Sequence, residues 1–294
     1  MYKSSLTILE NRTVLTISGD DAKNFLQGLV TNDVDKVSEE NTIYTALLTP
    51  QGKYLHDFFI LKIGDKYYLD CEESRIEDLI RRLRMFKLRT NVIIELANEM
   101  CVIAIYGDRT IEGLSLTHSL GYSKPHVDGK IYTDPRLETI GARGIVPKTS
   151  IIELSENDRL KITPFESYDK LRISLGLPDS SRDMKIEKST LLESGFDELN
   201  GVSFNKGCYI GQELTARTKH RGLIKRRLIP IRFTTSQPFE GMVIQQGNKE
   251  IGEVRSFQGN WAIGMIRLDA LESDVVITVN GSPIVLKKPY WTNF

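Results

Sequence analysis

Apolar residues in the first fifty positions recur first at strand spacing and then at helix spacing. Short, mostly apolar runs predict strands over residues 13–17 and 42–48. Between these runs, apolar residues fall three and four positions apart, which predicts an amphipathic helix that begins after Gly19-Asp20-Asp21. We expect Asp20 or Asp21 to accept hydrogen bonds from the first N–H groups of this helix. Its apolar face consists of Ala22, Phe25, Leu26 and Leu29.

The next part of the chain predicts a hairpin, a longer helix and two more strands. Residues 55–63 and 67–71 are strand-like and are joined by Gly64-Asp65-Lys66, which is a turn composition. Residues 72–88 then carry apolar side chains at helical spacing, and strand-like runs follow at residues 92–96 and 101–106. The inward face of the helix is expected to be Ile76, Leu79, Ile80 and Leu83. So close a mixture of helix and strand predicts a compact α+β unit over residues 50–135.

The last third of the chain changes to short strands separated by Gly or Asn turns. Before it, a helix near residues 167–175 is expected to end at Gly176, because Pro178 bars its continuation. Residues 177–205 are rich in Asp, Ser, Glu and Gly and predict an irregular connection. Six strand-like runs after residue 223 predict a small β-barrel or sandwich. These runs are residues 228–233, 242–245, 251–256, 261–266, 275–279 and 283–286.

The bulk composition is that of an ordinary soluble globular protein with two or three cores. Of its 294 residues, 40% are hydrophobic and 27% are charged, and 39 Lys and Arg residues balance 39 Asp and Glu residues. This balance gives no global electrostatic case for nucleic acid or a membrane, and we expect neither partner. The N-terminus lacks the apolar core of a signal peptide, and no run approaches the ~20 apolar residues of a membrane span. A monomer in the cytosol, or in an organelle after processing, is expected.

Three cysteines limit the possible redox and metal chemistry. Their odd number and the lack of a C-x-x-C pair argue against a disulfide framework. They also argue against a self-contained zinc or iron–sulfur site, which needs about four ligands. We therefore expect a reducing compartment and no tightly bound metal. Cys71 and Cys101 lie inside strand-like runs and are expected to be small buried residues.

Cys208 stands in a different setting, inside the octet Lys206-Gly207-Cys208-Tyr209-Ile210-Gly211-Gln212-Glu213. Glycines on both sides allow positive φ or a close backbone approach, so the thiol can project from a tight bend. Lys206, Arg217 and Lys219, or a helix that begins at about Gly211, would favour the thiolate if they fold near the sulfur. These features favour a reactive Cys208 over a buried one.

The octet, together with the Leu214-Thr215-Ala216-Arg217 and Lys219-His220-Arg221-Gly222 that follow it, resembles the signature of the YgfZ family of folate-binding proteins. Segments at residues 17–22, 25–33, 49–53 and 171–178 resemble the same family in the same order. That family is related to the T protein of the glycine cleavage system and includes the mitochondrial factor for late iron–sulfur protein maturation. The resemblance is weak over residues 102–162 and in the last third of the chain.

The resemblance implies an α+β fold of three lobes, like that of aminomethyltransferases, with a ferredoxin-like insertion and a C-terminal small β-barrel. Residues 1–49 with 136–222 would form a discontinuous folate-binding domain, residues 50–135 the insertion, and residues 223–294 the barrel. The implied cofactor is tetrahydrofolate or a one-carbon derivative, and the implied partners are iron–sulfur client or assembly proteins. The implied role is that of an accessory factor rather than an enzyme, in the cytoplasm or, in a eukaryote, the mitochondrial matrix.

Reduced folate has a flat pteridine and an anionic glutamyl tail, so its site needs an apolar slot, a few polar groups and a cation. Candidate residues also have structural alternatives: Tyr44 can be core, Arg172 can pair across its helix, and Asn32-Asp33 can form only a turn. Asp57, in the region of the T protein's catalytic Asp, is a candidate acid or base, or simply an Asp at a strand end. The candidate folate contacts are Gln27, Asn32, Asp33, Tyr44, Arg172, Glu193 and Arg217.

Three other activities compete with this role. An aminomethyltransferase follows from the T-protein relationship, but Ser174 stands where those enzymes usually carry a pteridine-contacting Glu, and its hydroxyl cannot replace a carboxylate. The basic stretch 217–227 can bind a polyglutamate tail, a phosphate, an acidic partner or, in a tRNA-modification accessory protein, RNA; it can also be only a solvated surface. A Cys208/His220 pair could serve a thiol hydrolase, for which the chain shows no oxyanion hole or orienting acid.

Overall fold

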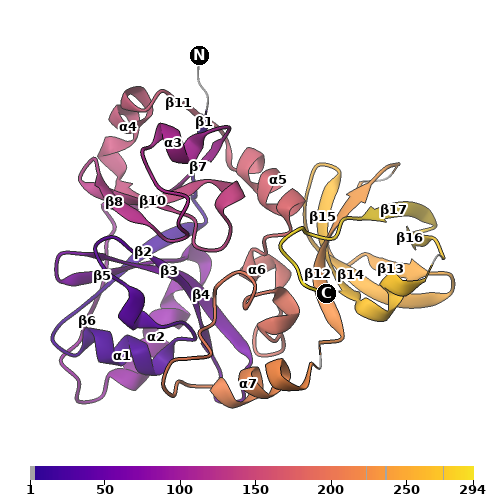
Figure 1. Cartoon of the computed structure of the whole chain (residues 1–294), viewed down its shortest axis with the longest axis horizontal. Helices are drawn as coiled ribbons and strands as arrows, with labels where there is room; N and C mark the ends of the chain where they lie inside the picture. The colour runs from indigo at the N-terminus through magenta and orange to yellow at the C-terminus, as the bar shows by residue number, and fades with distance from the viewer. Residues whose placement is uncertain (1–3, 223, 236, 274) are drawn as a thin grey trace. The chain divides into compact units, whose positions relative to one another are not determined.

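The computed structural model of the chain describes residues 4–222, 224–235, 237–273 and 275–294. Segments that alternate along the chain form two compact units (Figure 1). The first contains Met1–Leu48, His56–Phe165 and Leu199–Ile210, and the second contains Thr49–Leu55, Glu166–Glu198 and Gly211–Phe294. Both units are therefore discontinuous in sequence, and the octet is divided between them after Ile210.

One sheet of the first unit has five strands in the order β3-β4-β5-β2-β6. β4 and β5 are the predicted hairpin, in which Phe59 pairs with Asp70 and Ile63 with Lys66. β2 pairs antiparallel with β5 on one side and with β6 on the other, so β6 lies at the edge of the sheet. The strands are β2 Arg12–Ser18, β3 Ile43–Leu48, β4 Tyr54–Ile63, β5 Lys66–Glu72 and β6 Ile93–Leu96.

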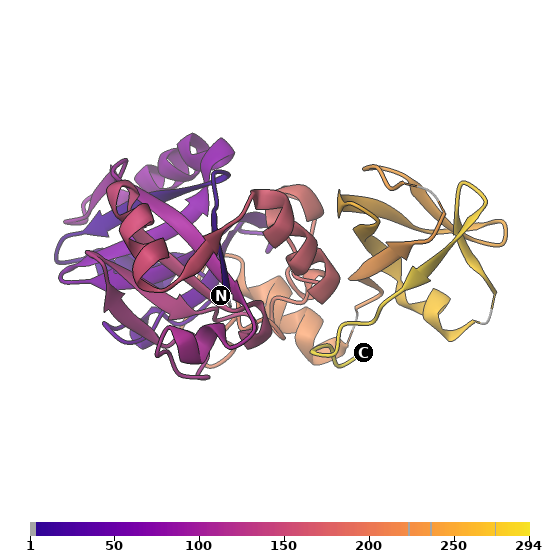
Figure 2. The same ribbon diagram turned by 90° about the horizontal axis from the view of Figure 1, so that it is seen from above.

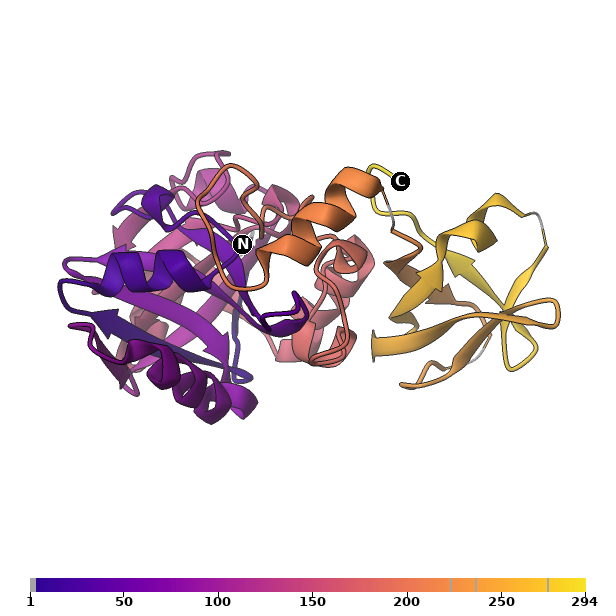
Figure 3. The same ribbon diagram turned by 90° about the horizontal axis from the view of Figure 1, so that it is seen from below.

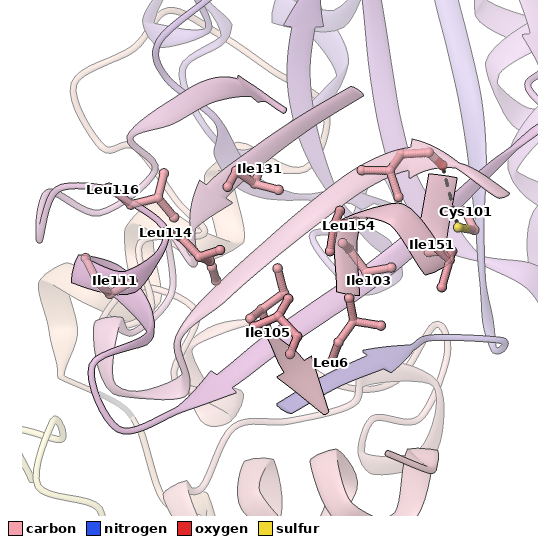
Figure 4. Close-up of a cluster of buried hydrophobic side chains, with 13 residues drawn as sticks. Leu6, Cys101, Ile103, Ile105, Ile111, Leu114, Leu116, Ile131, Ile151 and Leu154 are labelled. Carbon is pink, nitrogen blue, oxygen red and sulfur yellow. Dashed lines mark hydrogen bonds between the residues drawn. The ribbon is translucent and has the colours of Figure 1, made fainter. Parts of the chain in front are cut away.

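The other sheet of this unit has six strands in the order β11-β1-β7-β10-β9-β8. β1 pairs parallel with β11, and the remaining described pairs are antiparallel. Strands β1, β7 and β9 and helix α4 contribute Leu6, Ile103, Ile105, Ile131 and Leu154 to one buried apolar cluster (Figure 4). The elements are β1 Ser4–Ile8, β7 Met100–Gly107, α3 Thr110–Gly113, β8 Ser123–His126, β9 Gly129–Thr133, β10 Ala142–Pro147, α4 Ile151–Asn157 and β11 Leu160–Ile162.

The two longer helices of the first unit largely confirm the predicted apolar faces. α1, Ala22–Leu29, buries all four predicted residues, and α2, Ile76–Lys87, buries three of its four, with Ile80 only half-buried. The predicted cap of α1 is wrong. The Asp21 carboxylate instead accepts a hydrogen bond from the Asn91 backbone N–H (2.7 Å), and the Asp20 carboxylate accepts one from the Asn91 side chain (3.1 Å). These bonds connect the start of the helix to the segment before β6.

Turns of 3-10 helix occur at Val34–Lys36, Glu73–Arg75, Glu138–Ile140 and Lys148–Ser150.

Sheet pairing crosses the predicted boundaries at residues 49 and 135. β2 and β3, from the first 49 residues, share a sheet with β4, β5 and β6. β7, β8 and β9 lie in the other sheet with β1, β10 and β11. Residues 50–135 are thus divided between two sheets, because hydrogen bonding between strands depends on their position in space and not on their separation along the chain.

The last part of the second unit is a closed barrel of six strands in the order β12-β15-β14-β13-β16-β17, as predicted. Leu223, the first residue of the predicted barrel domain, lies outside the described residues. Figures 2 and 3 show the ring of strands from two further sides, in the orange-to-yellow part of the chain. Its buried apolar cluster includes Ile231, Phe233, Ile244 and Ile266. The strands are β12 Arg226–Phe233, β13 Val243–Gln246, β14 Lys249–Gln258, β15 Trp261–Arg267, β16 Ile277–Val279 and β17 Ser282–Leu286, with a 3-10 turn at Leu268–Glu272.

Three helices and a mostly irregular connection precede the barrel. α5, Phe165–Leu175, ends before Gly176 as predicted, and α7, Gln212–Arg221, begins directly after Gly211. Between them, the regular structure of residues 177–205 consists of α6, Ser180–Asp183, and a 3-10 turn at Leu192–Ser194. This connection is nevertheless packed, because Leu191, Leu192 and Phe196 are at most 1% exposed.

Candidate functional site

Cys208 is the one cysteine of the three whose side chain is exposed. Cys71 in β5 and Cys101 in β7 are buried, as predicted. Burial raises the pKa of Cys71 well above its ordinary value and that of Cys101 to about 11. A thiol with so high a pKa stays protonated and unreactive at neutral pH. In the native fold, a partner or reagent therefore reaches the Cys208 sulfur and not the other two.

Lys206 fastens the loop that carries Cys208 to the end of α1. Its buried ammonium group donates hydrogen bonds to the carbonyl oxygens of Gln27 (2.8 Å), Val30 (2.7 Å) and Asn32 (2.8 Å). These carbonyls belong to the last turn of the helix and the residues after it, where a helix leaves acceptors unsatisfied. Burial lowers the pKa of Lys206 to about 8. The Lys206 ammonium group is thus hydrogen-bonded to backbone carbonyls, and its expected effect on a thiolate at Cys208 stays a prediction.

Tyr209 and Gly211 shape the rest of the octet. The Lys206 Nζ lies 5.3 Å from the centre of the buried Tyr209 ring, a cation–π contact within the loop. Gly211 has φ +81° and needs the left-handed backbone that favours glycine. Gly207 does not, because its φ is not positive and a Cβ built there would meet no atom within 4 Å. Of the two glycines in the octet, only Gly211 therefore has a backbone conformation that requires glycine. Gln212 and Glu213 follow it as the first residues of α7.

A polar pocket of about 240 Å³ lies in the first unit beside the residues that hold Lys206. Asn32 belongs to both features, because its backbone carbonyl accepts from Lys206 and its side chain lines the pocket. The Asn32 Nδ2 donates to the carbonyls of Tyr44 (2.8 Å) and Asn200 (2.7 Å), so this side chain shapes the wall. The polar lining residues are Asn32, Lys36, Asn41, Thr42, Tyr44 and Asn200. The apolar ones are Ile43, Leu120, Pro135 and Val202.

Tyr44 and Asp57, two predicted site residues, form a buried pair. The Tyr44 hydroxyl donates to Asp57 Oδ2 (2.9 Å), and the two residues are 0% and 8% exposed. The Tyr44 ring centre lies 4.9 Å from that of Phe59 and 5.5 Å from the guanidinium carbon of Arg136. Tyr44 is thus a core residue that also borders the pocket, which is the structural alternative given for it. The acid–base role of Asp57 stays a hypothesis.

Two arginines that the sequence did not single out lie in the same unit, the buried Arg143 and the half-buried Arg12. Arg12 and Arg143 both pair with Asp70, and Arg143 also lies 4.4 Å from the Phe59 ring centre. Burial alone would lower the pKa of Arg12, but the charges of Asp70 and Asp57 outweigh this effect and raise that pKa. Arg143 falls in the stretch where the family resemblance is weak, so no motif marks it. Asn200 could have been found from sequence, because an Asn before a Gly is a turn signal. In the structure its φ is +56°, which agrees with such a turn.

Gln27 and Asp33 bind each other at the end of α1. The Gln27 Nε2 donates to Asp33 Oδ1 (2.7 Å), and the Gln27 Oε1 accepts from the Val34 N–H (2.8 Å). Burial alone would raise the pKa of Asp33, but hydrogen bonds from the Gln27 side chain and the Asp35 N–H lower it. Both side chains therefore stabilise the turn after α1, which agrees with the structural alternative for Asn32-Asp33.

The other three candidate folate contacts lie in the second unit. Arg172 on α5 is 3% exposed, and all of its guanidinium nitrogens donate to acceptors within the unit. Glu193 accepts from the Thr190 hydroxyl (2.9 Å), whereas Arg217 on α7 is exposed and forms no ion pair with a described residue. The acceptors of Arg172 are Asp169 (2.6 Å), the Leu177 carbonyl (3.0 Å), Asp183 (2.9 Å) and Ser256 (2.8 Å). Arg172 therefore pairs with Asp169 across its helix, which is the structural alternative given for it, and also bonds to other parts of the second unit.

Two cations of the basic stretch are neutralised within the second unit. Lys219 pairs with Asp197 (2.7 Å), and the buried Arg227 pairs with Glu198. His220 is exposed, and no acid among the described residues orients it as a Cys–His hydrolase would require.

No three His, Cys, Asp or Glu side chains gather as metal ligands in the part of the chain that the structure describes. Within the same residues, none of the helices has the length and apolar character needed to cross a membrane. One exposed thiol supplies a single ligand, so a cluster bound at Cys208 would take its other ligands from another molecule.

Two parts of the chain match known domain families. Residues 8–120 match the GCVT N-terminal domain, and residues 225–294 match the CAF17 C-terminal beta-barrel domain. The structure superposes on the glycine cleavage system aminomethyltransferase T from Bartonella henselae with a TM-score of 0.79, over 99% of this chain and 87% of that one, at 16% identity. The predicted aminomethyltransferase-like α+β fold with a terminal barrel is thereby confirmed.

Relatives with similar sequences are named as iron–sulfur cluster assembly factors. The mitochondrial factor IBA57 of Homo sapiens is 29% identical over 95% of this chain and 82% of its own length, and that of Mus musculus 28% over 94% and 81%. The mitochondrial IBA57 homolog of Neurospora crassa is 32% identical over 78% of this chain but only 53% of its own length, so the chain spans about half of that relative. The chain thus has the aminomethyltransferase T fold, ends in a barrel that matches the CAF17 domain, and is similar along most of its length to iron–sulfur cluster assembly factors named IBA57.

Proposed function

We propose that this chain is an accessory factor for the assembly or repair of iron–sulfur proteins and that Cys208 is its functional thiol. The observation that carries the proposal is the exposure of Cys208 on a loop fixed by Lys206, in a chain whose other cysteines are buried. Similarity to relatives named IBA57 supports the same role. Their names place those relatives in mitochondria, and we propose the mitochondrial matrix, or the cytoplasm of a bacterium, for this chain.

The thiol chemistry that fits best is the donation of one ligand to a cluster shared with a client or assembly protein. A cluster needs about four ligands, and the described residues gather no set of three. The cluster would then be a substrate that passes between proteins. A mixed disulfide with a client and attack on a folate-borne one-carbon group are the alternatives that the same thiol allows.

We further propose that the pocket of the first unit takes the pteridine ring of tetrahydrofolate or a one-carbon derivative. Its volume of about 240 Å³ is below the ~300–1,000 Å³ of sites that enclose whole drug-sized ligands, so the remainder of a folate would lie outside it. A mostly polar lining with a few apolar residues offers hydrogen-bonding partners to the edges of a flat ring and apolar contact to its faces. Lys36 lines the pocket and forms no ion pair with a described residue, so it is available to a glutamyl carboxylate.

Cys208→Ser tests the role of the thiol. We expect this variant to fold normally, because the side chain is exposed, and to lose the ability to restore activity to the cluster-free form of a [4Fe–4S] enzyme. Cys101→Ala is the matched control and should keep that ability, because its side chain reaches no partner. Full activity of Cys208→Ser would remove the thiol from the mechanism.

Lys36→Gln tests the folate pocket by isothermal titration with tetrahydrofolate carrying one or three glutamates. We expect the variant to bind the triglutamate about two- to fivefold more weakly, which is the range for one exposed ion pair, and Lys161→Gln to bind as the wild type does. Absence of binding by the wild-type protein would exclude a folate site and leave the proposal for Cys208 untouched.

The fold favours one rival, a folate-dependent aminomethyltransferase that acts on a lipoyl-bound intermediate. Ser174 counts against it, because its hydroxyl donates to the Leu171 carbonyl (2.8 Å) and supplies no carboxylate. Formation of methylene-tetrahydrofolate at enzymatic rates from a lipoyl carrier, its aminomethyl intermediate and tetrahydrofolate would support the rival. An RNA adaptor is weaker still, since two cations of the basic stretch are already paired.

A further inference from the structure

The C-terminal turn of α2 and the residue that follows it expose three large apolar side chains. Met85 is 66% exposed, Phe86 41% and Leu88 87%. Leu88 follows the helix with φ 34°, in the region that favours glycine. Single exposed apolar residues are normal on a protein surface, whereas a contiguous group of them indicates an interaction surface. We call residues 84–89 the α2 tip.

Cations alternate with the apolar residues of the α2 tip. Arg84, Lys87 and Arg89 form no ion pair with any residue that the structure describes. The arginines nearer the start of the helix differ, because Arg75, Arg81 and Arg82 all pair with Asp78. The α2 tip is therefore both apolar and positively charged, in a protein whose formal net charge is zero.

β6 follows the α2 tip in the chain and presents an open sheet edge. Among the described strands it pairs only with β2, and its Ile93 and Leu96 are 49% and 41% exposed. The opposite edge strand, β3, is covered in part, because the Thr31 N–H donates to its Ala46 carbonyl (3.0 Å). Proteins usually protect edge strands with charges, proline or a covering segment. β6 carries one charge, Glu95, and its other three residues are apolar, so another strand can still pair with this edge.

We propose that the α2 tip and the edge of β6 bind an acidic, extended segment of a partner protein, which adds a strand to β6. Carboxylates of that segment pair with Arg84, Lys87 and Arg89, and its apolar side chains cover Leu88 and Ile93. An apolar side chain of the partner contacts Ile80 and Met85 in a groove of about 520 Å³. The groove is lined by Glu77, Ile80, Arg81, Arg84 and Met85. This surface is separate from Cys208 and from the pocket, and the proposal does not rest on the iron–sulfur role.

An anionic membrane is the other kind of partner that a basic and apolar surface attracts. β6 distinguishes the two. Lipid laid against β6 would leave its outward backbone N–H and C=O groups without hydrogen bonds, at a large cost in free energy. A partner strand supplies those hydrogen bonds, so the edge favours a protein.

The test measures binding of a fluorescent peptide, EVELEVELE, to the whole chain by fluorescence anisotropy. The variant Arg84→Glu/Lys87→Glu/Arg89→Glu is expected to bind this acidic peptide at least about tenfold more weakly. It should prefer the lysine peptide KVKLKVKLK, because its new glutamates then meet the opposite charges of the lysines. Its matched control is Lys148→Glu/Lys161→Glu/Lys170→Glu, which makes the same change in net charge at exposed lysines elsewhere and should bind as the wild type does.

Two further measurements identify the mode of binding. Leu88→Gly, which removes the side chain at a backbone conformation that suits glycine, should weaken binding without changing its salt dependence. Hydrogen exchange should show new protection at residues 93–96 when the peptide is bound. The proposal is overturned if the wild type does not bind the acidic peptide saturably, if both triple variants bind it equally, or if β6 gains no protection. The surface would be assigned to membranes instead if the wild type binds phosphatidylserine vesicles but not the peptide, and if the first triple variant loses vesicle binding.

Discussion

At the residue scale, one buried lysine determines how the cysteine loop is held. Lys206 reaches three carbonyl oxygens at the end of α1, and no other described side chain donates hydrogen bonds to all three. The same burial lowers its pKa to about 8, from 10.5 in a solvated lysine. The loop is therefore attached by a group whose charge changes a little above neutral pH.

Lys206→Met tests the linkage between this charge and stability. The unfolded chain still binds the lysine proton at pH values where the folded chain has released it, so the free energy of unfolding contributed by Lys206 rises from pH 8 to about 10.5. We expect the stability lost in Lys206→Met, measured by urea unfolding, to be larger at pH 9.5 than at pH 7.5. An equal loss at both pH values would show that Lys206 keeps its ordinary pKa in the fold.

Sequence could predict the environment of each cysteine but not the contacts of Lys206. Cys71 and Cys101 lie in apolar runs and Cys208 in a glycine-containing turn, so local composition indicated which thiols are buried. The carbonyls that bind Lys206 lie 174 to 179 residues earlier in the chain, and nothing local marks them. Arg172 is a similar case, because its partner Ser256 comes from a strand of the barrel.

At the element scale, the barrel depends on glycines where strands approach closely. A Cβ at Gly252 in β14 would lie 2.4 Å from the Met265 backbone oxygen. A Cβ at Gly264 in β15 would instead meet the ends of the Ile231 and Ile244 side chains, at 2.6 and 2.8 Å. Backbone cannot move aside as easily as a methyl group, so the two positions should tolerate substitution differently.

Alanine substitutions test this difference. Gly252→Ala should lower the free energy of unfolding by about 1–3 kcal/mol, and Gly264→Ala by less. Gly207→Ala, where the added Cβ meets no atom within 4 Å, should stay within about 0.5 kcal/mol of the wild type. Urea unfolding monitored by circular dichroism measures all three, and a Gly264→Ala loss larger than that of Gly252→Ala would contradict the argument.

The positions of helices and strands could be predicted from the sequence more accurately than the pairing of the strands. The hairpin β4–β5, the buried face of α1 and all six barrel strands appear where the apolar pattern and turn residues predict them. The division of residues 50–135 between two sheets could not be predicted in this way, because pairing of β2 with β5 and β6 joins distant segments. The cap of α1 failed for a related reason, since Asn91 lies 70 residues from Asp21.

At the scale of the whole molecule, positive and negative charges cancel. The formal net charge is zero at pH 7 and the isoelectric point is about 6.9. A protein without net charge lacks the mutual repulsion that keeps molecules apart. Regions such as the α2 tip are then local departures from neutrality and not part of a general positive field.

Solubility should therefore pass through a minimum near pH 7 at low salt. We expect the concentration of protein left after centrifugation to be higher at pH 6 and pH 8 than at pH 7, and added salt to raise it at pH 7 by screening attraction between patches of opposite charge. A solubility that changes steadily across this range would contradict the expectation.

Because one cysteine is exposed and two are buried, a thiol-specific reagent should modify the folded chain at a single position. Under native conditions a maleimide dye should attach once per molecule, at position 208, without any engineering. Left in air without a reductant, the same position is expected to join two copies covalently, so gel electrophoresis with and without dithiothreitol reports directly on whether that sulfur is accessible.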